Sequence, residues 1–300
     1  MIKRVKIENS RGNSLTMTLT NPVDCGIYVA KIDGLGPPKA TIAMNDYCSI
    51  DGSKFSMARA ETRNITFNLG FLPCPSIEES RHRSYEYFPI KEKIKITVET
   101  DIRTTCTTGY IESNEPDIFS REEETKISVL CPDPYFHAER DQYTSFYGSM
   151  GLFEFPFSNE IDGPGIRFGE FYARNGATII YDGDVSTGVT IDVEAIGETG
   201  NIHIHNMSDN ETFIVSSELV ECLTGTPIQA GDEIIACTER GNKSCFLARN
   251  GVYINIISCV DRTSKWLTIH RGSNKFVVSC DGGEDTAHIT VSNKILYFGV

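Results

Sequence analysis

Short runs in which apolar and polar residues alternate recur along this 300-residue chain, and they constrain the fold more than any other feature. Ile94, Ile96 and Val98 alternate with polar neighbours, as expected for a strand with one face in water. Turn dipeptides at 51–52 (Asp-Gly) and 250–251 (Asn-Gly) lie next to such runs. The other alternating runs lie at 189–193, 202–204, 252–256, 276–278 and 289–291. Many short strands separated by turns predict a mainly β fold built from sandwiches or barrels.

One helix is predicted in the first half of the chain. Ser76 begins the sequence S-I-E-E, and Glu79, three residues later, completes a capping box. Pro89 ends the helix because proline cannot continue it. The residues expected on one face, at helical spacing, are Ile77, Arg81, Tyr85 and Phe88. The first half is therefore predicted to be a β-barrel or sandwich that carries one helix.

The length and the charge distribution both favour two domains. A typical domain has ~150 residues, so a chain of this length is expected to form two. Residues 1–150 hold 18 basic and 21 acidic side chains, a net charge of −3, whereas residues 151–300 hold 10 and 20, a net charge of −10. Pro132 and Pro134 interrupt the strand pattern, and the polar stretch after them lacks periodicity. We predict a first domain over 1–138, a linker over 139–150 and a second domain over 151–300, made of strands and turns to its end.

The net charge of −13 limits the partners. Phosphate backbones and anionic membrane surfaces favour basic proteins, so we expect no specific nucleic acid and no membrane as partners. The first residues lack the apolar core of a signal peptide, and no apolar run approaches the ~20 residues of a membrane span. The ten cysteines form no C-x-x-C pair or zinc-like cluster, so we expect reduced thiols in a protein that folds in a cytoplasm.

Candidate chemical sites are weak in this sequence. Gly163, Gly165 and Gly169 are spaced one residue too widely for a dinucleotide fingerprint, and a strand-like segment follows them instead of a helix. His203 and His205 share one strand face, but no further ligand completes a metal set.

Two further features also have simpler interpretations. Asp182 and Asp184 flank a hairpin glycine without the ligand ladder of a calcium loop. Trp266 suits a sugar-stacking platform, although a single tryptophan in a strand more often packs in a core or at a domain contact. We therefore predict no enzymatic activity and no catalytic, cofactor-binding or metal-binding residues, and we favour a structural or binding role.

The order of motifs in the first half resembles a known family. The motifs are KIDGLGPPKATI, DGSKF, ARAETRNITFNLGF, SIEESRHRSYEYF, KIKITVETDIR, GYIESNEPDIFS and KISVLCPDPYF. Over roughly 20–138 the chain resembles the distal tail proteins of long-tailed bacteriophages, which build the hub between the tail tube and the tail tip or baseplate.

The second half resembles the galectin-like domain that many of these proteins carry. The segments are GNIHIHNMSDNETF, QAGDEIIACTERGNKSCFLARNGVYINII, SKWLTIHRGSNKF and LYFGV. The resemblance implies a second, galectin-like β-sandwich. Asn206 and Trp266 alone do not rebuild the constellation with which galectins bind sugar, so sugar binding is not implied.

The resemblance implies a structural protein of the virion, located at the tail tip and assembled in the host bacterial cytoplasm. It implies a homo-hexameric ring, formed by the first domains, that leaves a channel for DNA. The implied partners are the tail tube protein, the tape measure protein and a tail tip or fibre protein. The alternatives are a carbohydrate-binding protein that acts in host recognition through the second domain, and a glycan-degrading enzyme.

Overall fold

The computed structural model describes residues 1–18, 26–48, 50–120, 123–151, 169–173, 176–281 and 287–300. It confirms the predicted mainly β fold class. The chain divides into two compact units. Unit 1 comprises Met1–Arg140 and Leu296–Val300, and unit 2 comprises Asp141–Ile295.

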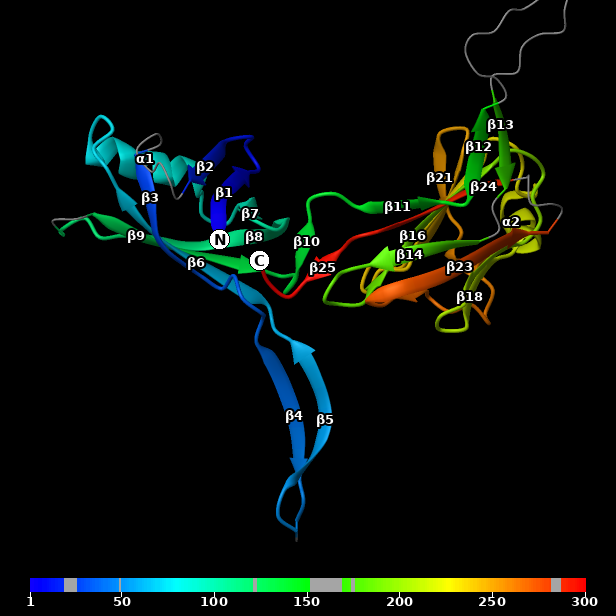
Figure 1. The fold of residues 1–300 in the computed structure, drawn as a ribbon, viewed down its shortest axis with the longest axis horizontal. Helices are drawn as coiled ribbons and strands as arrows, with labels where there is room; N and C mark the ends of the chain where they lie inside the picture. Colours follow the sequence, from blue (N-terminus) through cyan, green and yellow to red (C-terminus); the bar gives the residue numbers. More distant parts are fainter. Residues whose placement is uncertain (19–25, 49, 121–122, 152–168, 174–175, 282–286) are drawn as a thin grey trace, which may run out of the picture. The chain divides into compact units, whose positions relative to one another are not determined.

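Unit 1 is built on one large antiparallel sheet whose central path runs β2-β1-β7-β8-β9-β6-β3 (Figure 1). Alternate residues of each strand point to one buried face, as with Ile94, Ile96 and Val98 in β7. Facing residues of the neighbouring strands complete this core. The strands are β1 (Ile2–Asn9), β2 (Ser14–Thr18), β3 (Ile27–Asp33), β6 (Arg63–Phe71), β7 (Lys93–Thr100), β8 (Thr104–Pro116) and β9 (Glu124–Cys131).

The predicted helix is confirmed as α1 (Ile77–Tyr87), with Ser76 as its N-cap accepting from the Glu79 backbone N–H. The four residues predicted to share a face are not all buried, because Tyr85 is exposed, while Ser80 and Ser84 are buried beside Phe88. Small serines let the helix approach the sheet closely, and each hydroxyl donates to a backbone carbonyl. Hydrophobic spacing alone therefore missed the contact face.

The last five residues of the chain belong to unit 1, although the sequence places them in the second domain. Strand β25 (Leu296–Tyr297) pairs with β10 (Phe136–Ala138), which in turn pairs with β8. Two arginines, Arg103 and Arg63, contact this segment. Arg103 stacks on the Tyr297 ring and donates to the Gly299 carbonyl at 3.0 Å. Pairings of two residues carry no periodicity, so the sequence pattern could not predict them.

Arg63, at the start of β6, is the central contact of this region. Its guanidinium is only 4% exposed and donates to four backbone carbonyls, with 2.8 Å to Pro134 and 2.6 Å to Phe298. The other two acceptors are Gly34 and Gly36. The charge also lies over the Phe136 ring, 4.5 Å from its centroid. One side chain thus joins three segments that lie far apart in the sequence.

A long hairpin interrupts unit 1 between β3 and β6. Its strands are β4 (Ala40–Asp46) and β5 (Ser53–Ala60), which pair only with each other among the described strands. In Figure 1 the two strands run away from the large sheet as a separate ribbon. We call residues 40–60 the arm.

Unit 2 is a sandwich of two antiparallel sheets around one apolar core. One sheet has the order β11 (Gln142–Ser145), β24 (Ala287–Asn293), β16 (Thr190–Ala195), β19 (Glu233–Cys237), β20 (Ser244–Arg249) and β21 (Val252–Asn255). The other has the order β14 (Gly176–Tyr181), β23 (Gly272–Cys280), β17 (Ile202–Asn206) and β18 (Glu211–Val215). Two small pairs complete the unit: β12 (Tyr147–Gly151) with β13 (Gly169–Ala173), and β15 (Thr187–Gly188) with β22 (Thr268–Ile269).

Unit 2 differs from the prediction in two places. The predicted linker over 139–150 contains β11 and the beginning of β12. A second helix, α2 (Ser217–Thr224), lies where only strands and turns were expected, with Ser216 as N-cap and Gly225 at φ 82° ending it. These caps were readable in the sequence, but an eight-residue helix shows too little periodicity to be recognised.

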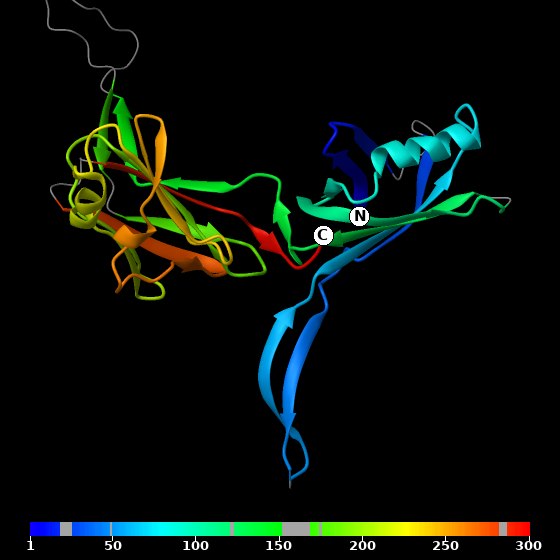
Figure 2. The same ribbon diagram turned by 180° about the vertical axis from the view of Figure 1, so that it is seen from behind.

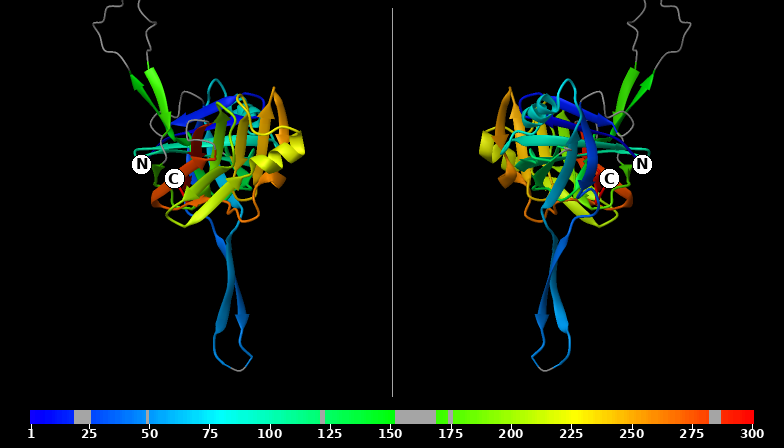
Figure 3. Two further views of the ribbon diagram at one scale, coloured as in Figure 1. Left: turned by 90° about the vertical axis from the view of Figure 1, so that its right-hand side faces the viewer. Right: turned by 90° about the vertical axis from the view of Figure 1, so that its left-hand side faces the viewer.

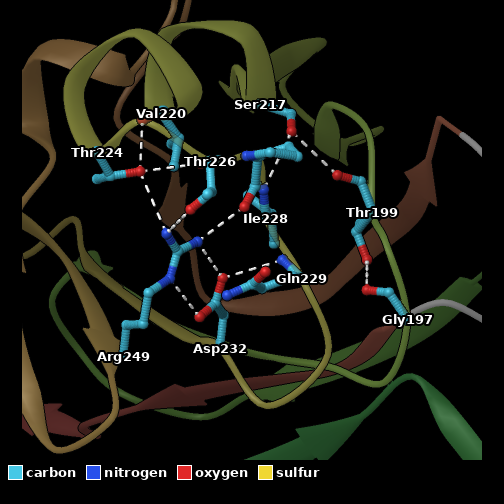
Figure 4. Close-up of polar contacts among 11 residues, drawn as sticks. Gly197, Thr199, Ser217, Val220, Thr224, Thr226, Ile228, Gln229, Asp232 and Arg249 are labelled. Carbon is cyan, nitrogen blue, oxygen red and sulfur yellow. Dashed lines mark hydrogen bonds and ion pairs between the residues drawn. The ribbon is translucent and has the colours of Figure 1, made fainter.

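Arg249 of β20 connects this sheet to the loop after α2 (Figure 4). Its guanidinium binds both carboxylate oxygens of Asp232, which is 2% exposed, and donates to the Pro227 carbonyl at 2.8 Å. The bond to Asp232 raises the pKa of Arg249.

In the part of the chain that the structure describes, no helix is long and apolar enough to span a membrane.

Replacing Arg63 is expected to destabilise unit 1 selectively. In Arg63→Met, four carbonyls lose a charged donor, so the free energy of unfolding should fall by at least about 3 kcal/mol. Circular dichroism during denaturation should show that the part of the unfolding transition due to unit 1 moves to a lower denaturant concentration. The fluorescence of Trp266, the single tryptophan of the chain, reports unit 2 and should not move with it.

Arg59→Met is the matched control, because Arg59 is exposed on the arm. Equal stabilities of the Arg63 and Arg59 variants would contradict the role assigned to the buried guanidinium.

Candidate functional site: an exposed apolar arm

The histidine pair considered in the sequence has partners other than a metal ion. His203 and His205 lie on the same face of β17, as expected, but each has another partner. His203 lies 3.5 Å from the Asp281 carboxylate, and His205 hydrogen-bonds Thr212 at 2.7 Å. Among the described residues, no group of three His, Cys, Asp or Glu side chains could hold a metal ion.

The aspartate pair lies beside a tightly packed glycine, and the glycine loop falls mostly outside the described residues. Asp184 lies 3.7 Å from Arg271, and Gly183, beside Asp182, packs against the Tyr181 ring with no room for a side chain. Gly163 and Gly165 lie outside the described residues, and Gly169 begins β13.

Asn206 and Trp266, the two residues that suggested sugar binding, are used inside unit 2. Asn206 is fully buried and donates to Asp209 and to the Thr268 carbonyl, both at 2.9 Å. Trp266 packs on Phe213 with 5.5 Å between ring centroids, and the Lys243 ammonium lies 5.2 Å from its ring centroid. Asn206 is therefore engaged inside the unit, and the half-buried Trp266 ring is in contact with Phe213 and Lys243.

A serine, a histidine and an aspartate that the sequence did not single out lie in a row. Ser186 Oγ is 2.6 Å from His270 Nδ1, and His270 Nε2 is 3.4 Å from Asp209. The imidazole is about half exposed, at 51%. Ser186 thus contacts Nδ1 and Asp209 lies nearest Nε2, and the row continues from Asp209 to Asn206, which donates to its carboxylate.

An acidic groove of about 450 Å³ crosses the outer face of the larger unit 2 sheet. Glu194 of β16 lies directly opposite Glu233 of β19, and Asp192 lies beside them. Burial raises the pKa of Asp192, and the charges of Glu233 and Glu194 raise it further. Among the described residues that line the groove, three are acidic, and the one with a basic side chain is His288, 3.9 Å from Glu194.

The arm is the most conspicuous feature without a function inside its own unit. Every residue of β4 and β5 is exposed or half-buried. Its large apolar side chains are more than half exposed: Ile42 54%, Met44 57%, Tyr47 51%, Ile50 72%, Phe55 59% and Met57 57%. A two-stranded hairpin is marginally stable alone, so this surface suits contact with another molecule.

A register shift in the hairpin gathers three of these side chains on one face. Ala43 pairs with Met57, but the next pair joins Met44 to Phe55, so Ser56 is the extra residue of a β-bulge. Side chains alternate along a strand, and Ile42 and Met44 therefore share a face with Phe55. We call Ile42, Met44 and Phe55 the apolar triad.

The fold of the chain, over both units, is similar to that of a solved phage protein. It is similar to the crystal structure of the Dit protein (gp 19.1) of phage SPP1, described as a paradigm of the hub adsorption apparatus in phages infecting Gram-positive bacteria. The TM-score is 0.62 at 9% sequence identity, covering 97% of this chain and 98% of that one.

Two structures of the phage P2 baseplate in its activated conformation match more distantly. The one with Ca has a TM-score of 0.48 at 13% identity, covering 98% of each chain, and the one with Sr has 0.44 at 11%, covering 97% of each. No family model matches the chain, and no curated protein matches it in sequence.

Simple galactosides are not expected to bind this protein at millimolar concentration, because Asn206 and Trp266 are engaged internally. Nuclear magnetic resonance during titration with lactose checks this. Chemical-shift changes that cluster around Trp266 would contradict it and support a carbohydrate-binding protein.

Asp192→Asn is expected to raise the unfolding temperature at pH 7. A carboxyl whose pKa is raised on folding destabilises the folded state above that pKa, and this cost disappears once the group is protonated. The gain should therefore shrink as the pH falls through the acidic range. Differential scanning fluorimetry across pH measures it.

Asp261→Asn provides the control of opposite sign. Hydrogen bonds from Thr263 lower the pKa of Asp261, so this variant should gain no stability at pH 7. A pH-independent gain for Asp192→Asn would contradict the electrostatic explanation.

Proposed function

We propose that the chain is a structural, non-enzymatic component of a phage tail tip or baseplate. Six copies form a hub ring that connects the tail tube to the tip or receptor-binding apparatus and leaves a channel for DNA. The observation that carries the proposal is the fold shared with the SPP1 hub protein over nearly the full length of both chains. The exposed arm supports it, since such a surface suits a protein that works in an assembly.

In this proposal the two units have different tasks. Unit 1 forms the ring, and unit 2, as a galectin-like sandwich, lies apart from the ring contacts. Unit 1 carries 18 basic and 20 acidic residues, a net charge of −2, whereas unit 2 carries 10 and 21, a net charge of −11. Six copies of unit 2 in close contact would gather six times −11, or −66. Repulsion of that size persists at short range even with screening over about 8 Å.

The proposed partners are the tail tube protein, the tape measure protein and a tail tip or fibre protein. The proposed location is the tail tip of the virion, after assembly in the host cytoplasm. Four of the polar residues considered as chemical sites, His203, His205, Asp184 and Asn206, have partners within unit 2. The proposal includes no catalysis and no cofactor.

Fragments of the two units test this division. Residues 1–140 joined through a short Gly/Ser linker to 296–300 retain the Arg63 contacts and should form hexamers. Residues 141–295 should stay monomeric. Analytical ultracentrifugation distinguishes the outcomes, and a monomeric unit 1 fragment beside an oligomeric unit 2 fragment would reverse the assignment.

A further inference from the structure

The arm is a long excursion that the fold of unit 1 does not need. Strands β3 and β6, which flank it in sequence, are direct neighbours in the sheet, with Asp33 opposite Thr66. A short turn would connect them, yet the chain uses residues 34–62. Figures 2 and 3 show the arm as a separate ribbon from three further directions. Ordering these residues costs conformational entropy that the arm does not recover by burial in its own unit.

The two faces of the arm differ in chemistry. The apolar triad shares its face with the small residues Ala40, Ala58 and Ala60, and at the far end of the strands with the polar pair Asp46 and Ser53. The opposite face carries Thr41, Asn45, Lys54 and Arg59, and Met57 is its one large apolar side chain. One face of the arm is thus suited to burial and the other to water.

The root of the arm is fixed to unit 1. Arg63 holds the carbonyls of Gly34 and Gly36, the first residues of the excursion. Gly34 has φ 87°, and a Cβ there would lie 2.2 Å from the Asn64 carbonyl oxygen, so only glycine fits. The arm therefore begins from a defined backbone position rather than from a free linker.

The charge of the arm indicates which surface it fits. Residues 39–61 hold three basic and three acidic side chains, so the segment is neutral. A neutral apolar face suits a weakly charged partner with apolar side chains of its own. Unit 1 meets both conditions, with a net charge of −2 and an exposed cross-strand pair, Tyr110 and Leu130, on its sheet.

The area of one face of the arm is too small for a stable interface, so a partner that binds it must also contact another surface. Strands of seven or eight residues at ~3.3 Å per residue, two strands wide, offer one face of roughly 260 Å². A stable interface buries ~800 Å² on each side. A partner that binds the arm and also the unit carrying it would meet this requirement, as adjacent copies in a closed ring do.

We propose that the apolar triad of the arm docks onto unit 1 of a second copy of this chain. The contact joins two different surfaces, so each copy gives one arm and receives one, and such head-to-tail contacts close into a ring when the rotation between successive copies completes a full turn. This inference rests on the proposed ring and specifies the contact that holds it together.

The test compares two triple variants of the full chain that carry no change in charge. Ile42→Ser/Met44→Ser/Phe55→Ser removes the apolar triad, whereas Ala43→Ser/Asn45→Ser/Met57→Ser changes the opposite face. Sedimentation velocity should show the dissociation constant of the assembly raised about 100-fold or more by the first variant and little by the second. At a concentration where the wild-type chain is monomeric, both should keep its unfolding midpoint, since neither alters a core residue.

Photo-cross-linking identifies the partner directly. Benzoylphenylalanine at position 55 of the full chain should give cross-linked products of twice the chain mass. The same group at position 54, on the opposite face, should give few such products. If the assembly forms without cross-linking through position 55, or persists after loss of the triad, the proposed arm contact is wrong. The ring proposal is then unaffected. A wild-type chain that stays monomeric up to millimolar concentration overturns both.

Discussion

The buried guanidinium of Arg63 is the contact on which the organisation of unit 1 depends. It has no carboxylate within ion-pair distance among the described residues, so carbonyl dipoles and the Phe136 ring compensate its charge. Its acceptors lie at the root of the arm, in the segment before β10 and next to β25. The same side chain therefore fixes where the arm leaves the sheet and where the chain leaves for unit 2 and returns. Burial lowers the pKa of Arg63, but the group remains a cation at any physiological pH.

The sequence predicted those features that short segments encode. The alternation in β7, the cap of α1 at Ser76 and the Asn250–Gly251 turn each depend on a few neighbouring residues, and the structure has all three. The return of β25 to β10 and the serine face of α1 depend on tertiary contacts that leave no periodic pattern. The arm could not be recognised either. The alternation of Ile42 and Met44 is that of an ordinary half-buried strand, and only the structure shows that the described residues of the unit leave both side chains more than half exposed.

The candidate chemical residues and the arm differ in whether their side chains already have partners. His205, Asp184 and Asn206 form hydrogen bonds or ion pairs within unit 2, so their polar atoms stabilise turns and strand edges. The arm has the opposite property, because its strands are paired while its apolar side chains remain exposed. An exposed apolar arm of this kind is suited to contact with another molecule. In the proposed ring, the net charge of −11 on unit 2 disfavours close contact between copies of that unit.

Negative-stain electron microscopy of the purified full-length protein tests the ring most directly. The account predicts particles with sixfold rotational symmetry around a central opening, formed without any other tail protein. Particles of a single chain at every concentration, or closed dimers without an opening, would contradict it.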